Sequence, residues 1–124
     1  MKKPAMILVA DDEPLVADTL VQILREEGYE AIAVSDGAAA VRFARHARPG
    51  IIVCDVIMPT MNGIDAAKAI REFLPEVHII LFSGQAAAAG LIERAESEGH
   101  RFEVLAKPIK PDVLLKHIAA AITA

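Results

Sequence analysis

Short apolar runs alternate along the chain with longer stretches in which apolar residues recur every three or four positions. Five runs have the length of strands and cover residues 6–10, 31–34, 51–55, 79–82 and 104–106. Each is apolar at successive positions, which is typical of strands in a parallel sheet that helices cover on both faces. The pattern therefore predicts five strand–helix units in an α/β fold.

The first three helices between these runs have recognisable ends. Pro14 fits the first turn of one helix, and Gly28 fits the left-handed position just beyond its end. Asp36 is placed to cap a second helix at about residues 37–47, because a side-chain oxygen there accepts free backbone N–H groups. Asn62 is placed to cap the third helix in the same way.

The last two helices are expected within residues 86–98, ending at Gly99, and from Pro111 onward. Gly90 lies inside the fourth and lowers its helix propensity by about 1 kcal/mol relative to alanine. In the fifth helix, the side chains expected to face the sheet are Leu114, Ile118 and Ile122. Those expected to face solvent are Lys116 and His117.

Length and composition indicate a single domain spanning residues 1–124, with 54% apolar and only 4% aromatic residues. A net charge of -4 provides no basic face, so direct binding to nucleic acid is not expected. The apolar runs are all shorter than the roughly 20 residues that span a bilayer, and the amino terminus lacks a signal peptide's apolar core. We therefore expect a cytoplasmic protein that does not insert in a membrane.

The cysteine and the histidines of the sequence do not indicate a metal site or a redox site. Cys54 is the only cysteine, which excludes an intrachain disulfide, and its apolar neighbours predict a buried position in a strand. The four histidines show no paired spacing of the kind that metal ligands have. They are His46, His78, His100 and His117. We interpret each as a surface or helix-end residue.

Polar residues directly follow four of the predicted strands. Asp11 and Asp12 follow the first, Asp55 ends the third, Ser83 follows the fourth and Lys107 follows the fifth. Strand ends on one edge of a parallel sheet share a crevice, so three carboxylates, a hydroxyl and an ammonium should converge there. Crowded carboxylates need a proton or a cation, and oxygen-only ligands favour Mg²⁺ or Mn²⁺. The sequence predicts a site for a divalent cation and a phosphoryl group.

Simpler interpretations of these residues remain open. The run Asp11-Asp12-Glu13 could only cap the first helix, since acidic side chains are favoured at helix amino ends. Ser83 could be a turn hydroxyl and Lys107 a surface lysine.

Taken together, four strings closely resemble the receiver domains of two-component response regulators. They are Asp11-Asp12-Glu13-Pro14, Asp55-x-x-Met58-Pro59-x-Met61-x-Gly63, Ser83-Gly84 and Lys107-Pro108. The resemblance covers the whole chain. It implies a chemotaxis-regulator-like fold, which is a doubly wound (βα)5 three-layer sandwich whose five-stranded parallel sheet has the flavodoxin-like strand order 2-1-3-4-5.

The resemblance also implies a role for each carboxylate. Asp55 would accept a phosphoryl group from the phosphohistidine of a sensor histidine kinase or a histidine phosphotransfer protein. Mg²⁺, with Mn²⁺ as a substitute, would be held by Asp12, Asp55 and the main-chain carbonyl of Ile57, while Asp11 would act through a metal-bound water. Positioning and charge neutralisation are the main sources of catalysis in such a transfer.

The same resemblance assigns the remaining site residues. Lys107 would pair with the phosphoryl group or with Asp55, and Ser83, followed by Gly84, would move inward to donate its hydroxyl. The peptide between Lys107 and Pro108 is expected to be cis, an arrangement that proline makes accessible. Ile57, together with Gln85, would flank the path of the water that hydrolyses the acyl phosphate. An apolar Ile57 cannot orient that water, which predicts slow self-dephosphorylation.

One position departs from the family. Many receivers have an aromatic residue three places before the lysine, where this chain has Val104. Phe102 lies two places earlier on the same strand face and could partly replace it. It is therefore open how phosphorylation would change the conformation of the protein surface. This applies in particular to the face formed by the fourth helix, fifth strand and fifth helix. In this family that face commonly carries dimerisation or target binding.

The resemblance favours a phosphorylation-controlled binding module over an enzyme with an exchangeable substrate. Two alternatives are a pseudo-receiver that binds partners without phosphorylation and a Mg²⁺-dependent phosphatase with an aspartyl-phosphate intermediate. Such phosphatases often have Asp-x-Asp after the first strand and a cap domain, which this chain lacks. Because no residues follow Ala124, we expect no covalent output domain in this chain, which is either a single-domain regulator or a part of a longer protein. Its downstream protein target is unspecified.

Overall fold

Five parallel strands form one sheet in the order β2-β1-β3-β4-β5 within residues 6–84 and 86–123, which the computed structural model describes. The strands are β1 Met6–Ala10, β2 Glu30–Val34, β3 Ile51–Asp55, β4 His78–Ser83 and β5 Glu103–Ala106. This confirms both the parallel sheet and its predicted order. The amino-terminal stretch compared with a signal peptide and Gln85 lie outside the described residues.

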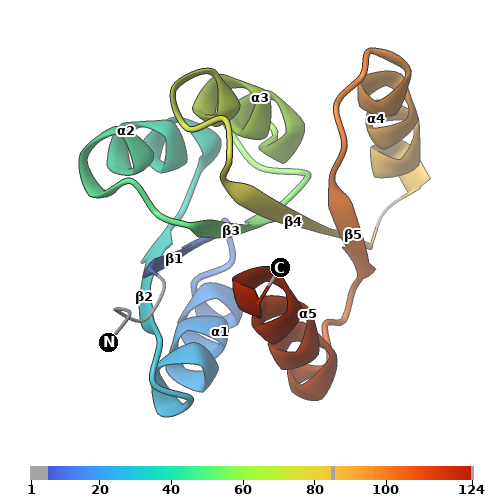
Figure 1. Cartoon of the computed structure of the whole chain (residues 1–124). Helices are drawn as coiled ribbons and strands as arrows, with labels where there is room; N and C mark the ends of the chain where they lie inside the picture. Colours follow the sequence, from blue (N-terminus) through green and yellow to red (C-terminus); the bar gives the residue numbers. More distant parts are fainter. Residues whose placement is uncertain (1–5, 85, 124) are drawn as a thin grey trace.

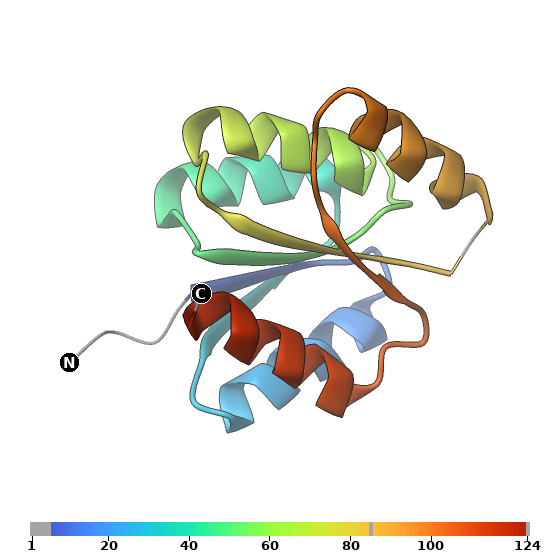
Figure 2. The same cartoon turned by 45° about the vertical axis from the view of Figure 1, so that its right-hand side comes forward.

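The helices cover the sheet on both faces. They are α1 Pro14–Glu26, α2 Gly37–Ala47, α3 Gly63–Phe73, α4 Ala86–Ser97 and α5 Pro111–Thr123. Figure 1 shows α1 and α5 on one face of the sheet and α2, α3 and α4 on the other. The turned view in Figure 2 shows the same three layers. The expected doubly wound sandwich is confirmed.

Local chemistry accounts for the helix ends. The Asp36 side chain accepts a hydrogen bond from the N–H of Ala39, and that of Asn62 accepts one from Asp65, so both predicted caps are present. Gly28 and Gly99 have φ angles of +92° and +93° directly after the last turns of α1 and α4. Glycine adopts this left-handed conformation without the steric cost of a Cβ.

Alternate residues of each strand enter different cores, as the pleat of a strand requires. Ile7, Val9 and Phe82 pack toward α1 and α5, whereas Leu8 and Leu81 pack toward α2, α3 and α4. All five are fully buried. The sheet is therefore apolar on both faces, and its carboxyl edge is where polar chemistry can reach solvent.

Cys54 and Ile122 test two predictions about burial. Cys54 is buried in β3, as expected, and burial raises the pKa of its thiol. Ile122 is 40% exposed, so the prediction that it faces the sheet was wrong. At about 100° per residue, position 122 lies about 80° from the direction of Leu114, whereas Ala121 lies about 20° from it and packs on the core.

A search of the described helices finds none with the length and apolar character needed to span a bilayer.

Candidate phosphoryl and metal site

The carboxyl ends of four strands meet at one edge of the sheet and bring the predicted polar residues together. Asp11 follows β1, Asp55 ends β3, Ser83 ends β4 and Lys107 follows β5. Backbone bonds fix these ends, because the N–H of Asp11 donates to Val34 and that of Lys107 donates to Ser83. The convergence expected from the sequence is therefore present.

Three carboxylates lie close together in this edge. Single oxygens of Asp11, Asp12 and Asp55 lie within 4.8 Å of one another. Asp11 and Asp55 are buried, with exposed fractions of 1% and 5%, whereas Asp12 is exposed. Like charges at this spacing repel, and burial removes the water that would screen them.

The Asp11 carboxylate shows the consequence most clearly. Its Oδ1 accepts a hydrogen bond of 2.9 Å from the N–H of Glu13, but its buried Oδ2 has no hydrogen-bond partner. Burial raises the pKa of Asp11 above its ordinary value, against the lowering effect of the Glu13 N–H and of Lys107. An unsatisfied buried carboxylate oxygen among oxygen donors fits a hard divalent cation.

Capping of α1 does not account for this acidic run. Glu13 is the N-cap residue of α1, yet its side chain makes no capping hydrogen bond, and the first turn contains no acidic residue. The Asp11 carboxylate instead accepts from the backbone of the loop. Of the two interpretations of these residues, the geometry favours the cation site.

Lys107 supplies the positive charge. Its Nζ donates to Asp55 Oδ2 at 2.8 Å and lies 3.7 Å from Asp11 Oδ2. Burial lowers the pKa of this ammonium, but the bond to Asp55 and the nearby carboxylates outweigh burial and raise that pKa above its ordinary value. Lys107 is thus a paired, charged group at neutral pH, and the interpretation as a solvated surface lysine was wrong.

The backbone around Lys107 restricts its side chain. The Lys107–Pro108 peptide is cis, as the resemblance implied. A Cβ added to Gly84 would lie 3.1 Å from the Lys107 Cβ, so glycine leaves room for the lysine side chain there. Ser83, the expected hydroxyl donor, is half-buried at the end of β4.

The loop after β3 holds Asp55 in place. The N–H of Ile57 donates to Asp55 Oδ1 at 3.3 Å, and the N–H of Gly63 donates to the Val56 carbonyl at 2.7 Å. A Cβ on Gly63 would lie only 2.1 Å from the Asp55 carbonyl oxygen, so α3 begins directly against the strand end. The loop leaves a pocket of about 340 Å³, lined by Asp12, Glu13, Asp55, Ile57, Gly84 and Lys107.

The region expected to hold an aromatic switch has a different arrangement. Val104 is 41% exposed on β5. The Phe102 ring lies under the Arg71 guanidinium, 4.8 Å from its carbon, and stacks against His100 with centroids 6.3 Å apart. Phe102 packs with the core on the α2, α3 and α4 side. Phe102 is therefore packed against Arg71 of α3 and against His100.

Two of the histidines, which are partly exposed as expected, share a carboxylate partner that the sequence did not predict. His78 Nε2 hydrogen-bonds to Glu103 Oε2 at 2.6 Å, and His117 Nδ1 contacts Glu103 Oε1. The three side chains come from β4, β5 and α5 and are each about one third exposed. Burial raises the pKa of Glu103, but the bonds from His117 and His78 outweigh it and lower that pKa below its ordinary value.

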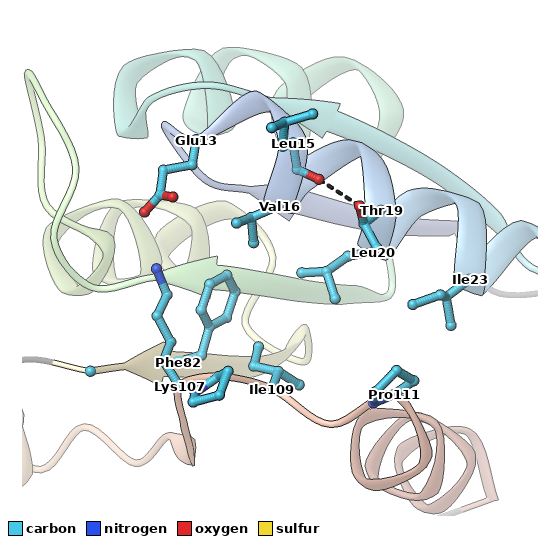
Figure 3. Close-up of a pocket in the computed structure, with 12 residues that line it drawn as sticks. Glu13, Leu15, Val16, Thr19, Leu20, Ile23, Phe82, Lys107, Ile109 and Pro111 are labelled. Carbon is cyan, nitrogen blue, oxygen red and sulfur yellow. Dashed lines mark hydrogen bonds between the residues drawn. The ribbon is translucent and has the colours of Figure 1, made fainter.

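Sequence reasoning also missed an apolar groove beside the site. Figure 3 shows it between α1 and the segment after β5, with Lys107 at one end. Its volume is about 620 Å³, and its apolar lining includes Val16, Leu20, Ile23, Phe82, Ile109 and Pro111. Leu15 at its rim is 83% exposed. Leu15 extends the apolar lining of the groove to the surface, and contiguous exposed apolar patches are typical of surfaces that contact a partner.

Comparison with known proteins agrees with this geometry. A family profile described as the response regulator receiver domain matches residues 7–119. The transcriptional regulatory protein PdtaR of Mycobacterium tuberculosis is 37% identical over 123 residues, which are 97% of this chain and 58% of that protein. A probable transcriptional regulatory protein of the same organism, TcrX, is 30% identical over 95% of this chain and 50% of its own length. The chain thus spans about half the length of these curated relatives.

Solved structures extend the comparison to the fold. A response regulator receiver domain protein from Clostridium thermocellum superposes with a TM-score of 0.86 at 27% identity. The superposition covers 96% of this chain and 94% of that one. The match therefore extends across the sheet and its helices.

Proposed function

The chain belongs to the response regulator receiver domain family of two-component signalling, and from that premise we propose that Asp55 accepts a phosphoryl group with the help of Mg²⁺. Residues 1–124 form a single receiver domain in this proposal. The observation that carries it is the Lys107 ammonium 2.8 Å from Asp55 Oδ2, beside three clustered carboxylates.

The donor set suits the metal. Asp12, Asp55 and the main-chain carbonyl of Ile57 would hold Mg²⁺, with Asp11 acting through a bound water. The buried Asp11 Oδ2 supports this arrangement, because it has no hydrogen-bond partner among the described residues and its nearest cation, the Lys107 ammonium, lies 3.7 Å away. When bound, Mg²⁺ neutralises charge on the transferring phosphoryl group and orients it. Mn²⁺ has the same preference for oxygen ligands and should substitute.

Asp55 is the nucleophile in this proposal. One of its carboxylate oxygens forms a bond to the phosphorus of a phosphohistidine as the P–N bond breaks. The electron pair of that bond stays on the imidazole nitrogen, and the ring, protonated at its other nitrogen, leaves as neutral imidazole. The N–H of Ile57 and the ammonium of Lys107 hold the carboxylate in a fixed orientation beforehand.

Lys107 and Ser83 respond to the product. The acyl phosphate adds negative charge at Asp55, so Lys107 pairs with a phosphoryl oxygen, and the Ser83 hydroxyl donates to another. Because Ser83 and Lys107 lie at the ends of β4 and β5, their movement repositions the two strands next to α4 and α5. A protein target would read that change, and the face of α4, β5 and α5 is also a candidate for homodimer formation.

The apolar groove gives the phosphodonor protein a docking surface. It runs along α1 and reaches Lys107, so a helix lying in it would bring its histidine next to Asp55. The partner expected from the family is a sensor histidine kinase or a histidine phosphotransfer protein. Groove residues such as Leu15 and Val16 would then determine which donor binds.

The test is labelling by a small phosphodonor, which needs no knowledge of the partner. The protein is incubated with acetyl phosphate and Mg²⁺, and its intact mass is compared with that of Asp55→Asn. We expect one phosphoryl increment in the parent and none in the variant. A parent that gains no increment, yet is folded by circular dichroism, would contradict the proposal and favour a pseudo-receiver. Repeated turnover of a phosphate ester would instead indicate the phosphatase.

A further inference from the structure

Phe82 is a buried aromatic residue that the proposed chemistry does not use. It lies in β4 next to Ser83 and pairs in register with Asp55 on one side and Leu105 on the other. Its carbonyl accepts the N–H of Val56, so the backbone at Phe82 is tied directly to the segment after Asp55. The side chain has no exposed surface.

The Phe82 ring lies against the site lysine. The Lys107 Nζ is over the ring, 5.2 Å from its centroid, and Figure 3 shows the ring beside the Lys107 side chain. The electron-rich face of an aromatic ring attracts a cation within about 6 Å. The ammonium therefore has the two carboxylates and the ring as partners, since Asp55 and Asp11 lie 2.8 and 3.7 Å from it.

The ring offers an attraction that differs from that of the carboxylates. Both carboxylates belong to the cluster that would hold Mg²⁺, so their charge is shared with the metal once it binds. An uncharged ring is not a metal ligand and keeps its attraction for the ammonium. Without the ring, the Lys107 ammonium would lose much of its electrostatic attraction to the site when Mg²⁺ binds the two carboxylates.

Resting on the proposed function, we infer that Phe82 is a positioning residue for Lys107, holding its ammonium at the site by a cation–π contact when the carboxylates are engaged elsewhere. The same ring lines the apolar groove with Val16, Leu20 and Ile109. The ring is already buried, but the Lys107 side chain is 24% exposed, so a partner in the groove would exclude water from the ammonium. Cation–π contacts strengthen when desolvated. Phe82 thus links occupancy of the groove to the position of Lys107.

The experiment removes the ring while keeping an apolar side chain. Phe82→Leu is the main variant, and Phe82→Met is a second ring-free variant with a flexible side chain. Ile80→Val is the matched control, because Ile80 is buried in the same core, two residues earlier on the same face of β4. All are checked for folding by circular dichroism before use.

The first readout is the NMR signal of the Lys107 ε-methylene protons in Mg²⁺-containing buffer without phosphodonor. Aromatic ring currents move the signals of protons over a ring face upfield. We expect upfield signals in the parent and Ile80→Val, and ordinary lysine positions in both ring-free variants. Signals that stay in place when the ring is removed would overturn the inference. This readout does not depend on phosphorylation.

The second readout is the rate of labelling by acetyl phosphate. We expect the ring-free variants to be labelled about fivefold more slowly than the parent. The energy of a partly exposed cation–π contact corresponds to a change in rate of about this size. Ile80→Val should retain the parental rate. Shifted methylene signals with an unchanged rate would overturn the positioning role. A parent that is never labelled contradicts the proposed function, while the NMR comparison still decides whether the ring holds Lys107.

Discussion

Replacing Gly63 by alanine should displace the segment that holds Asp55. The added Cβ would lie 2.1 Å from the Asp55 carbonyl oxygen, 2.9 Å from its carbon and 3.0 Å from the Cys54 Sγ. Real Cβ atoms essentially never approach other atoms within 3.0 Å, so α3 or the strand end must move by about 0.9 Å, the difference from 2.1 Å. Both nearest atoms are backbone, so no side-chain rotation can relieve the clash.

The size of the effect follows from this overlap. Overpacking a well-packed core costs about 1–3 kcal/mol, and a backbone clash belongs at the upper end of that range. The gain in helix propensity offsets about 1 kcal/mol at most, so we expect a net loss of about 2 kcal/mol in unfolding free energy. A misplacement near 1 Å can reduce the rate of a positioned reaction by about 10²-fold. We therefore expect the rate of labelling at Asp55 to fall by up to about 10²-fold in protein that is still folded.

Urea denaturation and acetyl phosphate labelling measure the two consequences. The control is Gly90→Ala in α4, where an added Cβ meets nothing within 4 Å. This control should gain roughly 0.5–1 kcal/mol and be labelled at the parental rate. If Gly63→Ala were as stable as the parent and were labelled as fast, the steric account of the Asp55 segment would be refuted.

Three further substitutions test separate parts of the site and its surroundings. Glu103→Gln should cost about 1 kcal/mol of unfolding free energy at pH 7. Because the folded pKa of Glu103 is lowered from its ordinary value of 4.5, this cost should begin to shrink as pH falls below 4.5 and vanish only below the folded pKa, and equal costs in urea titrations at pH 7 and pH 3 would contradict it. Lys107→Met should increase the rise in Tm that Mg²⁺ causes, because it removes a cation beside Asp55 and Asp11; an equal or smaller rise counts against the metal site. Ile57→Asn should speed decay of the phosphorylated form, since an amide can orient the attacking water; equal decay rates in Mg²⁺ would reject that role.

The strands and the site were predictable because their signals are local in sequence. Each site residue directly follows an apolar run, so the parallel order of the strands was enough to bring Asp11, Asp55 and Lys107 to one edge. The caps at Asp36 and Asn62 were also predictable, because an N-cap side chain bonds to a backbone only three residues away.

The features that the sequence did not predict depend on strand register and on packing between elements that are distant in the sequence. His78, Glu103 and His117 meet only because β4 and β5 pair with Ile80 opposite Glu103 and α5 packs over that face. No sequence spacing reports such a contact. Ile122 was misplaced because a small difference in helical phase decides between the core and solvent at the last turn.

The groove was hidden for a similar reason. Its walls come from α1, β4 and the segment after β5, and the residues in each look like ordinary core positions in the sequence. Only the assembled fold shows that Leu15 remains exposed and that Phe82 lies between the groove and Lys107.

The most direct test of the central claim locates the phosphoryl group within the chain. Protein labelled with acetyl phosphate and Mg²⁺ is treated with borohydride, which reduces an aspartyl phosphate to homoserine, and the peptides are sequenced by mass spectrometry. We predict homoserine at position 55 and aspartate at positions 11 and 12. Homoserine at another position, or none in a protein that carries the phosphoryl mass, would contradict the assignment of Asp55.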